Sequence, residues 1–441
     1  MRRSLIASAA FLACMAAPLA ASASIYMDSG ELHEQHTDVS LKAGALSVDI
    51  TRIYNSQSTY SGAFGYGWES RYEEYLRVFG GQIIVFEYGG GAVNLFKPDA
   101  AGAAPPSFSG LMSVEDELGR MASNRDERSV SSAFTGADSN NGAVAMDEMN
   151  RLLHLGFDFN QAPPPIGSTF FSNRFGTQRI TRYVEGYERE RSGYTEDFDL
   201  SGNLRRIFNA DGDYIAFSRN KAGALTGISD SAGHKLSFST SNYTVRSIRA
   251  PQGSLASYTY SKTGDLTQYR GANEAFTYGY DTNHDLTRIR HGNLSETIAY
   301  DRSYNVSRIA RSDGTVATFT FPQGGGGTEV YRKHGSTARG VFNKNADLVS
   351  VTDGAYSATA AYDSDDDVTS ITENGVTLAI EWGGSNVSKY TIAGRGSVTF
   401  NYDDKGNFSS ITGDPAIRAQ GNTMWHALDD RRKMFTLVDE I

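Results

Sequence analysis

Cysteine is almost missing from this chain, since Cys14 is the only one among 441 residues. It lies in an N-terminal segment that we expect to be removed. Neither disulfides nor thiol chemistry should therefore hold the remaining chain together or carry its function. Stability is expected to come from apolar burial and from hydrogen bonds between strands.

A surplus of basic residues is also missing. The 41 Lys and Arg residues are outnumbered by 51 Asp and Glu residues, which gives a formal net charge of -10. This argues against nucleic acid as a partner, because phosphate binding needs a basic surface. Proline is scarce at 10 residues, whereas the chain has 46 Gly, 24 Tyr and 23 Phe. Such a composition predicts many short strands joined by Gly and Asn/Asp turns.

Long apolar runs are absent beyond the N-terminus, so we expect no transmembrane span. Residues 1–23 begin with a basic MRR, continue with an apolar stretch and end in small residues, which is typical of an export signal. We expect cleavage after Ala23, and a periplasmic, secreted or cell-surface protein. An alternative takes FLAC as a lipoprotein signal with Cys14 as the lipidated residue.

An aromatic residue recurs at intervals of 19 to 22 residues, and we call these residues the repeat anchors. They are Phe198, Phe217, Phe238, Tyr260, Tyr280, Tyr300, Phe321, Phe342, Tyr362, Trp382 and Tyr402. A unit of about twenty residues is too short to bury a core alone, so consecutive units must stack. The period therefore predicts one long antiparallel sheet whose apolar face is covered or curled on itself.

A polar turn follows each anchor. Its first residue is often an acid that hydrogen-bonds the backbone two residues on, as at Asp281, Asp301, Asp363 and Asp403. Its fourth position requires left-handed backbone and is filled by Gly202, Gly264 and Gly406. His284 and Asp366 are acceptable there. Tyr304 and Ala346 are poor substitutes, which predicts a distorted turn or another loop type.

The strands of each unit have two further signals. An apolar residue follows the turn and a second comes three positions later, as with Leu286 and Ile289. This spacing conflicts with simple alternation and predicts a bulge or a strand end. A second turn is often Asp-Gly or Asn-Gly, and strict alternation follows, as in GVTLAIEW from Gly375.

The unit resembles a known repeat. The segments DFDLSGNLRRI, AYDRSYNVSRI and NYDDKGNFSSI resemble the YD-repeat of the bacterial Rhs family and of related toxin-complex and teneurin shells, over residues 195–413. A second stretch, Asp38–Val78, resembles the module that opens Rhs proteins. Its matching residues are Arg52, Tyr54, Asn55, Ser56, Gly62, Phe64, Gly65, Gly67 and Trp68. We interpret this module, within residues 24–98, as the first wall of the same sheet.

The resemblance implies a spiral β-shell that encloses or presents another polypeptide. Toxin-bearing members end the repeats with an Asp-Pro-x-Gly-Leu cleavage element, whereas here GDPAIRAQGN matches only at Asp414 and Pro415. Self-cleavage is therefore not expected, and the tail after Gly413 is too short for a toxin domain. Residues 414–441 are expected to form a tail, with a short amphipathic helix in MWHALDDRRKMFTLVDEI, residues 424–441. The array is short for a closed shell, so we expect an open or partial one.

The remaining segments give weaker signals. Residues 99–194 are typical of degenerate repeats or inserted loops, with strand character returning near QRITRYVEGYERERSGYTEDF. His33 and His36 lack a third zinc ligand. Asp281-x-Asn283-x-Asp285 begins like a calcium loop but lacks its Gly and closing Glu. The Gly324–Gly327 run is expected to be a flexible loop. We therefore expect no metal, cofactor or catalytic residue.

The sequence thus predicts an all-β, exported, non-enzymatic YD-repeat scaffold with a polypeptide partner or cargo. An alternative function is a cell-envelope carbohydrate-binding or adhesion module, in which exposed Tyr and Trp rings stack on glycans. An enzyme within residues 99–194 is a third alternative.

Overall fold

The computed structural model describes most of the chain between residues 24 and 424. The described residues are 24–27, 29–43, 46–58, 60–79, 81–87, 92–98, 162–172, 178–241, 243–323, 325–333, 335–364, 366–384, 386–403, 408–421 and 423–424. The expected export signal, the segment 99–161 and the end of the tail lie outside the described residues, as does Gly406. Within the described part, no helix is long and apolar enough to cross a membrane.

One antiparallel sheet of 28 strands, β7 to β34, makes up most of the molecule. Its first strands are β7 (Tyr75–Phe79), β8 (Gln82–Glu87), β9 (Ala92–Pro98), β10 (Thr169–Ser172), β11 (Gln178–Tyr183), β12 (Gly186–Arg191) and β13 (Tyr194–Asp199). Strand β9 pairs with β10, so the sheet continues across the segment 99–161. The strand character expected near residue 180 is confirmed by β11, β12 and β13.

The repeat region supplies the other strands, each paired with the next along the chain. They are β14 (Leu204–Phe208), β15 (Tyr214–Arg219), β16 (Leu225–Asp230), β17 (Lys235–Ser241), β18 (Thr244–Ala250), β19 (Gly253–Tyr260), β20 (Leu266–Arg270), β21 (Ala275–Tyr280), β22 (Leu286–His291), β23 (Leu294–Tyr300) and β24 (Val306–Arg311). After them come β25 (Val316–Thr320), β26 (Gly327–Lys333), β27 (Ser336–Phe342), β28 (Leu348–Asp353), β29 (Tyr356–Tyr362), β30 (Val368–Glu373), β31 (Val376–Gly383), β32 (Asn386–Ile392), β33 (Gly396–Tyr402) and β34 (Phe408–Gly413).

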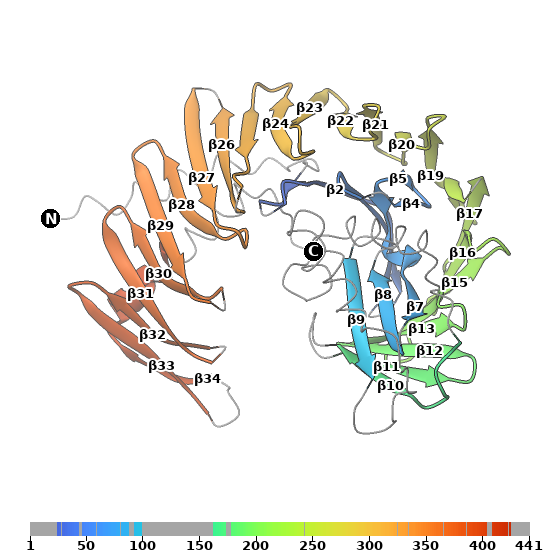
Figure 1. Cartoon of the computed structure of the whole chain (residues 1–441), viewed down its shortest axis with the longest axis horizontal. Helices are drawn as coiled ribbons and strands as arrows, with labels where there is room; N and C mark the ends of the chain where they lie inside the picture. Colours follow the sequence, from blue (N-terminus) through green and yellow to red (C-terminus); the bar gives the residue numbers. More distant parts are fainter. Residues whose placement is uncertain are drawn as a thin grey trace.

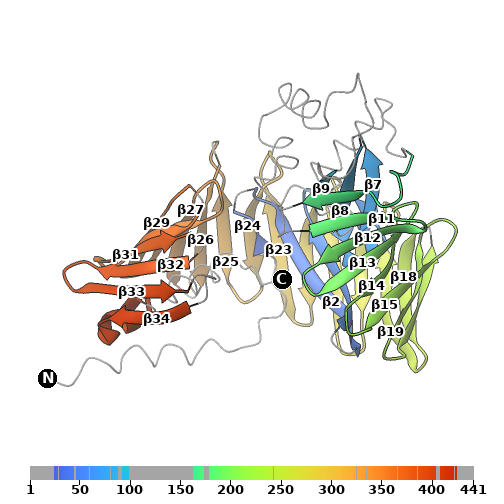
Figure 2. The same cartoon turned by 90° about the horizontal axis from the view of Figure 1, so that it is seen from below.

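The sheet bends into an open arch. Figure 1 shows β13 to β34 following one another around it, with β31 to β34 and β10 to β13 at its two ends, and Figure 2 shows β31 to β34 well separated from β11 to β13. Strand β34 pairs with β33 in the described structure. No other pairing of β34 is found among the described residues, and Figure 1 shows the two ends of the arch apart, so the sheet is open, as expected. At the other end, β7 folds back on the repeats, because Tyr75 bridges Asn203 and the Leu76 N–H donates to the Gly202 carbonyl at 2.8 Å.

The N-terminal module has its own sheet, of β1 (Ser24–Ile25), β2 (Leu32–Ala43), β3 (Leu46–Asn55) and β6 (Trp68–Glu69). A small hairpin, β4 (Ser61–Gly62) with β5 (Gly65–Tyr66), and a 3-10 turn, η2 (Arg71–Glu73), connect it to β7. Figure 1 shows β2, β4 and β5 on the concave side of the arch. Our interpretation of Asp38–Val78 as the first wall of the large sheet is therefore wrong, since only β7 joins that sheet.

The expected bulges are confirmed and recur at one position of the unit. Tyr280 pairs with Leu286 and Gly279 pairs with Arg288, so Thr287 is the extra residue. The same shift lies between the anchor and the residue before it at Tyr260, Tyr300, Phe342, Tyr362 and Tyr402. The bulge re-phases the strand, which is how two apolar residues three positions apart both reach the buried face.

The prediction of distorted turns at Tyr304 and Ala346 is wrong. Both adopt left-handed backbone with φ of 63°, as do His284 (71°) and Asp366 (63°), like Gly202 at 80° and Gly264 at 96°. The Tyr304 N–H donates to the Asp301 carbonyl at 3.2 Å, and the Asp301 N–H donates to the Asn305 carbonyl at 2.8 Å. The stacked strands and the Asp cap thus hold the turn in one conformation even without Gly.

A short helix over residues 415–421 and 423–424 follows β34. It packs on the sheet, because Ile417 and Met424 are buried and Ile417 lies against Gly396. A short helix in the tail is thus confirmed, but it lies before the predicted segment 424–441, of which only Met424 lies within the described residues. Of the glycine run, Gly327 begins β26 and lies close to Met27, so its lack of a side chain admits the N-terminal segment.

Candidate functional site

The repeat anchors face inward and use their polar atoms. Each of the eleven is buried or half-buried. The Tyr300 hydroxyl donates to the Leu286 carbonyl at 3.0 Å, 14 residues back. Tyr260, Tyr362, Trp382 and Tyr402 make the equivalent bond with the carbonyls of Val245, Leu348, Val368 and Val387. The bond reaches the carbonyl at the bulge of the preceding unit, where the regular ladder is interrupted.

The bulged residue makes a second recurring bond. The Thr287 hydroxyl donates to the Gly279 carbonyl at 3.1 Å, eight residues back. Thr226, Thr267, Ser307 and Thr369 repeat this contact. The residue after the apolar position is therefore Ser or Thr in these units for a local reason. A Ser or Thr at this fixed position of the unit therefore indicates the bulge in the sequence. The sequence analysis considered only the anchors, the turns and the apolar spacing and did not use this signal.

The predicted turn residues act as caps. The Asp281 carboxylate accepts from the N–H groups of Asn283 (2.8 Å) and Asp285 (3.1 Å). Asp301 repeats both bonds, and Asp363 accepts from the Asp367 N–H at 3.0 Å. Since the backbone uses Asp281 in this way, a calcium loop is not needed to explain these residues. Among the described residues, no group of three or more His, Cys, Asp or Glu side chains could hold a metal ion.

The module residues singled out in the sequence dock onto these repeat turns. The Tyr54 hydroxyl accepts from the Leu286 N–H at 2.9 Å and donates to the His284 carbonyl at 3.1 Å. The Trp68 Nε1–H donates to the Tyr280 hydroxyl at 2.9 Å. Tyr66 stacks on the His284 ring, with centroids 4.1 Å apart. These contacts all fall in the unit that begins at Tyr280. The unit before it is reached by the Tyr66 N–H, which donates to the Gly264 carbonyl, and the unit after it by the Val306 N–H, which donates to the Gly30 carbonyl.

Gly65 and Gly67 are required by close approach. Gly65 has φ of 96°, and a Cβ there would lie 2.5 Å from the Gly264 carbonyl oxygen. Gly67 has φ of 73°, and its Cβ would lie 2.7 Å from the Tyr54 ring. Asn55 and Ser56 serve the module itself, because Asn55 Oδ1 accepts from the Gln57 N–H and Ser56 Oγ accepts from the Leu32 N–H, both at 2.9 Å.

A buried ion pair joins the module to the repeats. Arg52 is fully buried, and its Nε donates to Asp38 Oδ2 at 2.8 Å. Its Nη1 donates to the Tyr278 hydroxyl at 2.9 Å, while the Tyr258 hydroxyl donates to Asp38 at 2.7 Å. Burial raises the pKa of Tyr258 and Tyr278, so both hydroxyls stay protonated and can donate or accept hydrogen bonds. The repeats thus provide the polar partners that this charged pair needs.

A second buried cluster lies where the sheet curls back on itself. The Arg189 guanidinium, fully buried, contacts the carboxylates of Glu74 (2.8 Å), Glu87 and Glu196 (3.3 Å). Burial raises the pKa of Glu74, and the neighbouring carboxylates add to this. Burial alone would also raise the pKa of Glu87, but Arg189 reverses the direction and lowers it. These groups satisfy one another, so the cluster is a structural one.

The fold defines an open β-repeat protein whose own N-terminal module packs on the concave face of its large sheet. Residues 23–96 match a family model described as a domain of unknown function (DUF6531). This match covers the N-terminal module through most of β9. No curated protein matches the chain.

Several solved structures are similar in part. In the crystal structure of TcdB2-TccC3 the match has 11% identity and a TM-score of 0.41, over 57% of this chain and 17% of that one. In TcdB2-TccC3-TEV the values are 9% and 0.42, over 87% and 23%. In the Photorhabdus luminescens Tc holotoxin pore, with a TccC3 mutation, they are 10% and 0.22, over 89% and 23%. The chain spans less than a quarter of each of these chains.

Proposed function

We propose that the protein is a short, Rhs-like, non-enzymatic β-shell scaffold that holds another polypeptide. One observation carries the proposal: the concave face of the repeat sheet packs against the chain's own folded N-terminal module, through the anchors and turns of successive units. A surface that presents aromatic hydroxyls, turn carbonyls and buried partners for charged pairs is suited to polypeptide rather than to a small substrate.

The glycan alternative depends on aromatic rings exposed along the sheet. Because all eleven anchors are buried or half-buried, they offer no continuous platform on which sugar rings could stack. No specific observation favours this second function, and the scaffold remains the proposal.

Purification from the native host tests the scaffold. The tagged full-length chain should retain a polypeptide after mild cross-linking, with cross-links to concave-face residues identified by mass spectrometry. Recovery of the chain alone, under conditions that preserve its fold by circular dichroism, would contradict the proposal.

Export is a separate proposal, supported by the composition of residues 1–23. We expect the mature protein outside the cytoplasm, with Ser24 as its first residue in N-terminal sequencing. A mature chain that starts at a lipid-modified Cys14 would support the lipoprotein alternative, and an uncleaved cytoplasmic chain would contradict both.

A further inference from the structure

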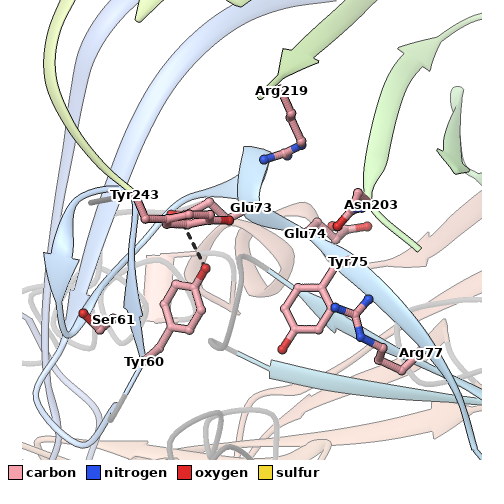
Figure 3. A pocket seen from close by; sticks show the side chains of 9 residues that line it. All are labelled: Tyr60, Ser61, Glu73, Glu74, Tyr75, Arg77, Asn203, Arg219 and Tyr243. Carbon is pink, nitrogen blue, oxygen red and sulfur yellow. Dashed lines mark hydrogen bonds between the residues drawn. The ribbon is translucent and has the colours of Figure 1, made fainter. Parts of the chain in front are cut away.

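A cavity of about 320 Å³ lies between the N-terminal module and the start of the repeats, apart from the docking contacts described above. Figure 3 shows Tyr60, Glu73 and Arg77 from the module side and Arg219 and Tyr243 from the repeats around it. The volume falls in the range of sites for small molecules. Polar side chains from two separate parts of the chain therefore converge on one space.

Two arginines in this cavity have fixed positions but no carboxylate partner in the described part of the chain. Arg219 donates from Nη2 to the Tyr72 carbonyl at 2.6 Å and from Nη1 to the Gly223 carbonyl at 3.1 Å. Its buried Nε has no hydrogen-bond partner among the described residues. Arg77 donates from Nη1 to the carbonyls of Leu76 and Ser201, at 2.7 and 2.9 Å. Neutral carbonyls thus hold both guanidinium groups. Neither forms an ion pair with a carboxylate of the described residues, although the charge of Arg219 acts on Glu73.

Glu73 provides a hydrogen-bonding group of a different kind. Its side chain is buried, and its Oε1 accepts from the Ala63 N–H at 2.6 Å and from the Tyr60 hydroxyl at 2.9 Å. Its Oε2 is buried and has no partner within the described part of the chain. A buried carboxyl oxygen without a partner is costly unless something binds it.

We propose that this cavity binds a small hydroxy-carboxylate, with the ligand's carboxylate held by Arg77 and Arg219 and one of its hydroxyl groups bound to Glu73 Oε2. Guanidinium groups match a carboxylate in charge and in geometry. The hydroxyl of Ser61 and the amide of Asn203, which also line the cavity, suit further hydroxyl groups of such a ligand. This site would take its ligand independently of the polypeptide partner proposed above.

The protonation of Glu73 should control the affinity. Burial raises the pKa of Glu73 to about 7, although its hydrogen bonds and Arg219 oppose the shift. The titratable and charged groups around it are Tyr60, Glu69, Glu74, Tyr75, Arg77, Arg219 and Tyr243. Burial also raises the pKa of Glu69 and of Glu74. As the pH rises through 7, Glu73 ionises and repels the bound anion, so binding should weaken.

Isothermal titration calorimetry with gluconate as the probe tests the site. We expect gluconate to bind at pH 5.5 and to bind about tenfold or more weakly at pH 8, because the ionised carboxylate of Glu73 then repels the carboxylate of the ligand. Sorbitol lacks the carboxylate and acetate lacks the hydroxyl groups, so each should bind at least about tenfold more weakly. Absence of gluconate binding at millimolar concentration and pH 5.5, or equal binding of acetate, would overturn the proposal.

Three substitutions test the assigned roles. Arg219→Met and Arg77→Met should each weaken gluconate binding about tenfold or more, whereas Arg249→Met, an exposed arginine outside the cavity, should leave it unchanged. Glu73→Gln keeps a neutral side chain of the same shape, so it should retain binding at pH 5.5 and reduce the loss at pH 8. Circular dichroism melting establishes that each variant is folded. Unchanged affinity in both folded arginine variants, or an unchanged pH profile in Glu73→Gln, would overturn the assignment.

Discussion

Single residues decide how the N-terminal module is held, and Arg52 is the clearest case. Its guanidinium lies 4.7 Å from the centroids of both the Trp68 and the Tyr269 rings, in addition to its contacts with Asp38 and Tyr278. The arginine therefore contacts the module and the repeats at once. The resemblance to the Rhs opening module included Arg52 on sequence grounds, whereas its partners in the repeats come from residues more than 200 positions away.

Replacement of Arg52 should be strongly destabilising. Arg52→Met leaves the Asp38 carboxylate buried without its partner, which is expected to cost about 3–5 kcal/mol in the free energy of unfolding. Urea denaturation measures this. The matched control is Arg205→Met, because the Arg205–Asp197 pair is partly exposed and should contribute about 1 kcal/mol or less. Equal losses in the two variants would contradict the role assigned to Arg52.

The anchor hydroxyl explains why Tyr is frequent at the start of a unit. Tyr300→Phe removes the bond to the Leu286 carbonyl and should cost about 1 kcal/mol in unfolding free energy. Tyr304→Phe removes a hydroxyl from a side chain that is 54% exposed and should change stability by less than about 0.5 kcal/mol. Because both variants lose a Tyr hydroxyl, the difference between their unfolding free energies measures the contribution of the hydrogen bond. A larger effect at Tyr304 than at Tyr300, measured by urea denaturation, would refute the assignment.

At the scale of strands and turns, the sequence predicted what local chemistry determines. The period of the anchors, the Asp caps and the three-residue apolar spacing correctly indicated hairpin units with bulges, because each depends on neighbours within about twenty residues. The turn at Tyr304 was mispredicted for the same reason. Local propensity disfavours left-handed Tyr, but the paired strands on both sides fix the turn regardless.

Long-range contacts could not be predicted from the sequence. Nothing near Gly202 indicates that β7 will fold onto it, since Leu76 is far away along the chain. Likewise the cavity residues Glu73 and Arg219 come from segments that carry no shared motif. The candidate site could therefore be predicted only for the module residues and the repeat turns, and not for how they meet.

The contact of β7 with the β13–β14 turn gives a test at this scale. Gly202 and Gly212 both have left-handed backbone, with φ of 80° and 89°. A Cβ at Gly202 would lie 2.0 Å from the Leu76 carbonyl oxygen, whereas one at Gly212 would meet nothing within 4 Å. Gly212→Ala should cost about 1–2 kcal/mol for its backbone alone. Gly202→Ala should cost about 1–3 kcal/mol more, measured by chemical denaturation, and similar costs would contradict the contact.

For the whole molecule, buried carboxyls should make stability depend on pH. Burial raises the pKa of Glu69, Glu74 and Glu329 well above the usual value, and that of Glu73 to about 7. A carboxyl whose pKa is raised by folding contributes fully to stability below about pH 4.5, which is its pKa in the unfolded chain. This contribution is lost as the pH rises through the pKa of the carboxyl in the folded protein. The buried His36 acts oppositely, because burial lowers its pKa and its contribution is lost as pH falls.

The four buried carboxyls together have a larger effect on stability than the single histidine. The urea concentration at the midpoint of unfolding should therefore decrease as the pH is raised from 5 to 8. Glu329, whose two carboxyl oxygens have no hydrogen-bond partner among the described residues, is the sharpest test. Because burial raises the pKa of Glu329, the stability of Glu329→Gln relative to the native chain should increase as the pH rises. Glu381→Gln, on an exposed side chain, should change little at either pH. A midpoint that rises with pH would contradict this account.

The position of the module on the concave face also constrains the order in which the chain can fold. Tyr54, Trp68 and Gly30 find their partners at Leu286, Tyr280 and Val306, which a ribosome would synthesise more than 200 residues later. The first strands made therefore have no surface to cover their apolar side until the middle of the array exists. Such high contact order predicts slow folding, and it favours completion of the whole arch before its first hairpin takes its final place.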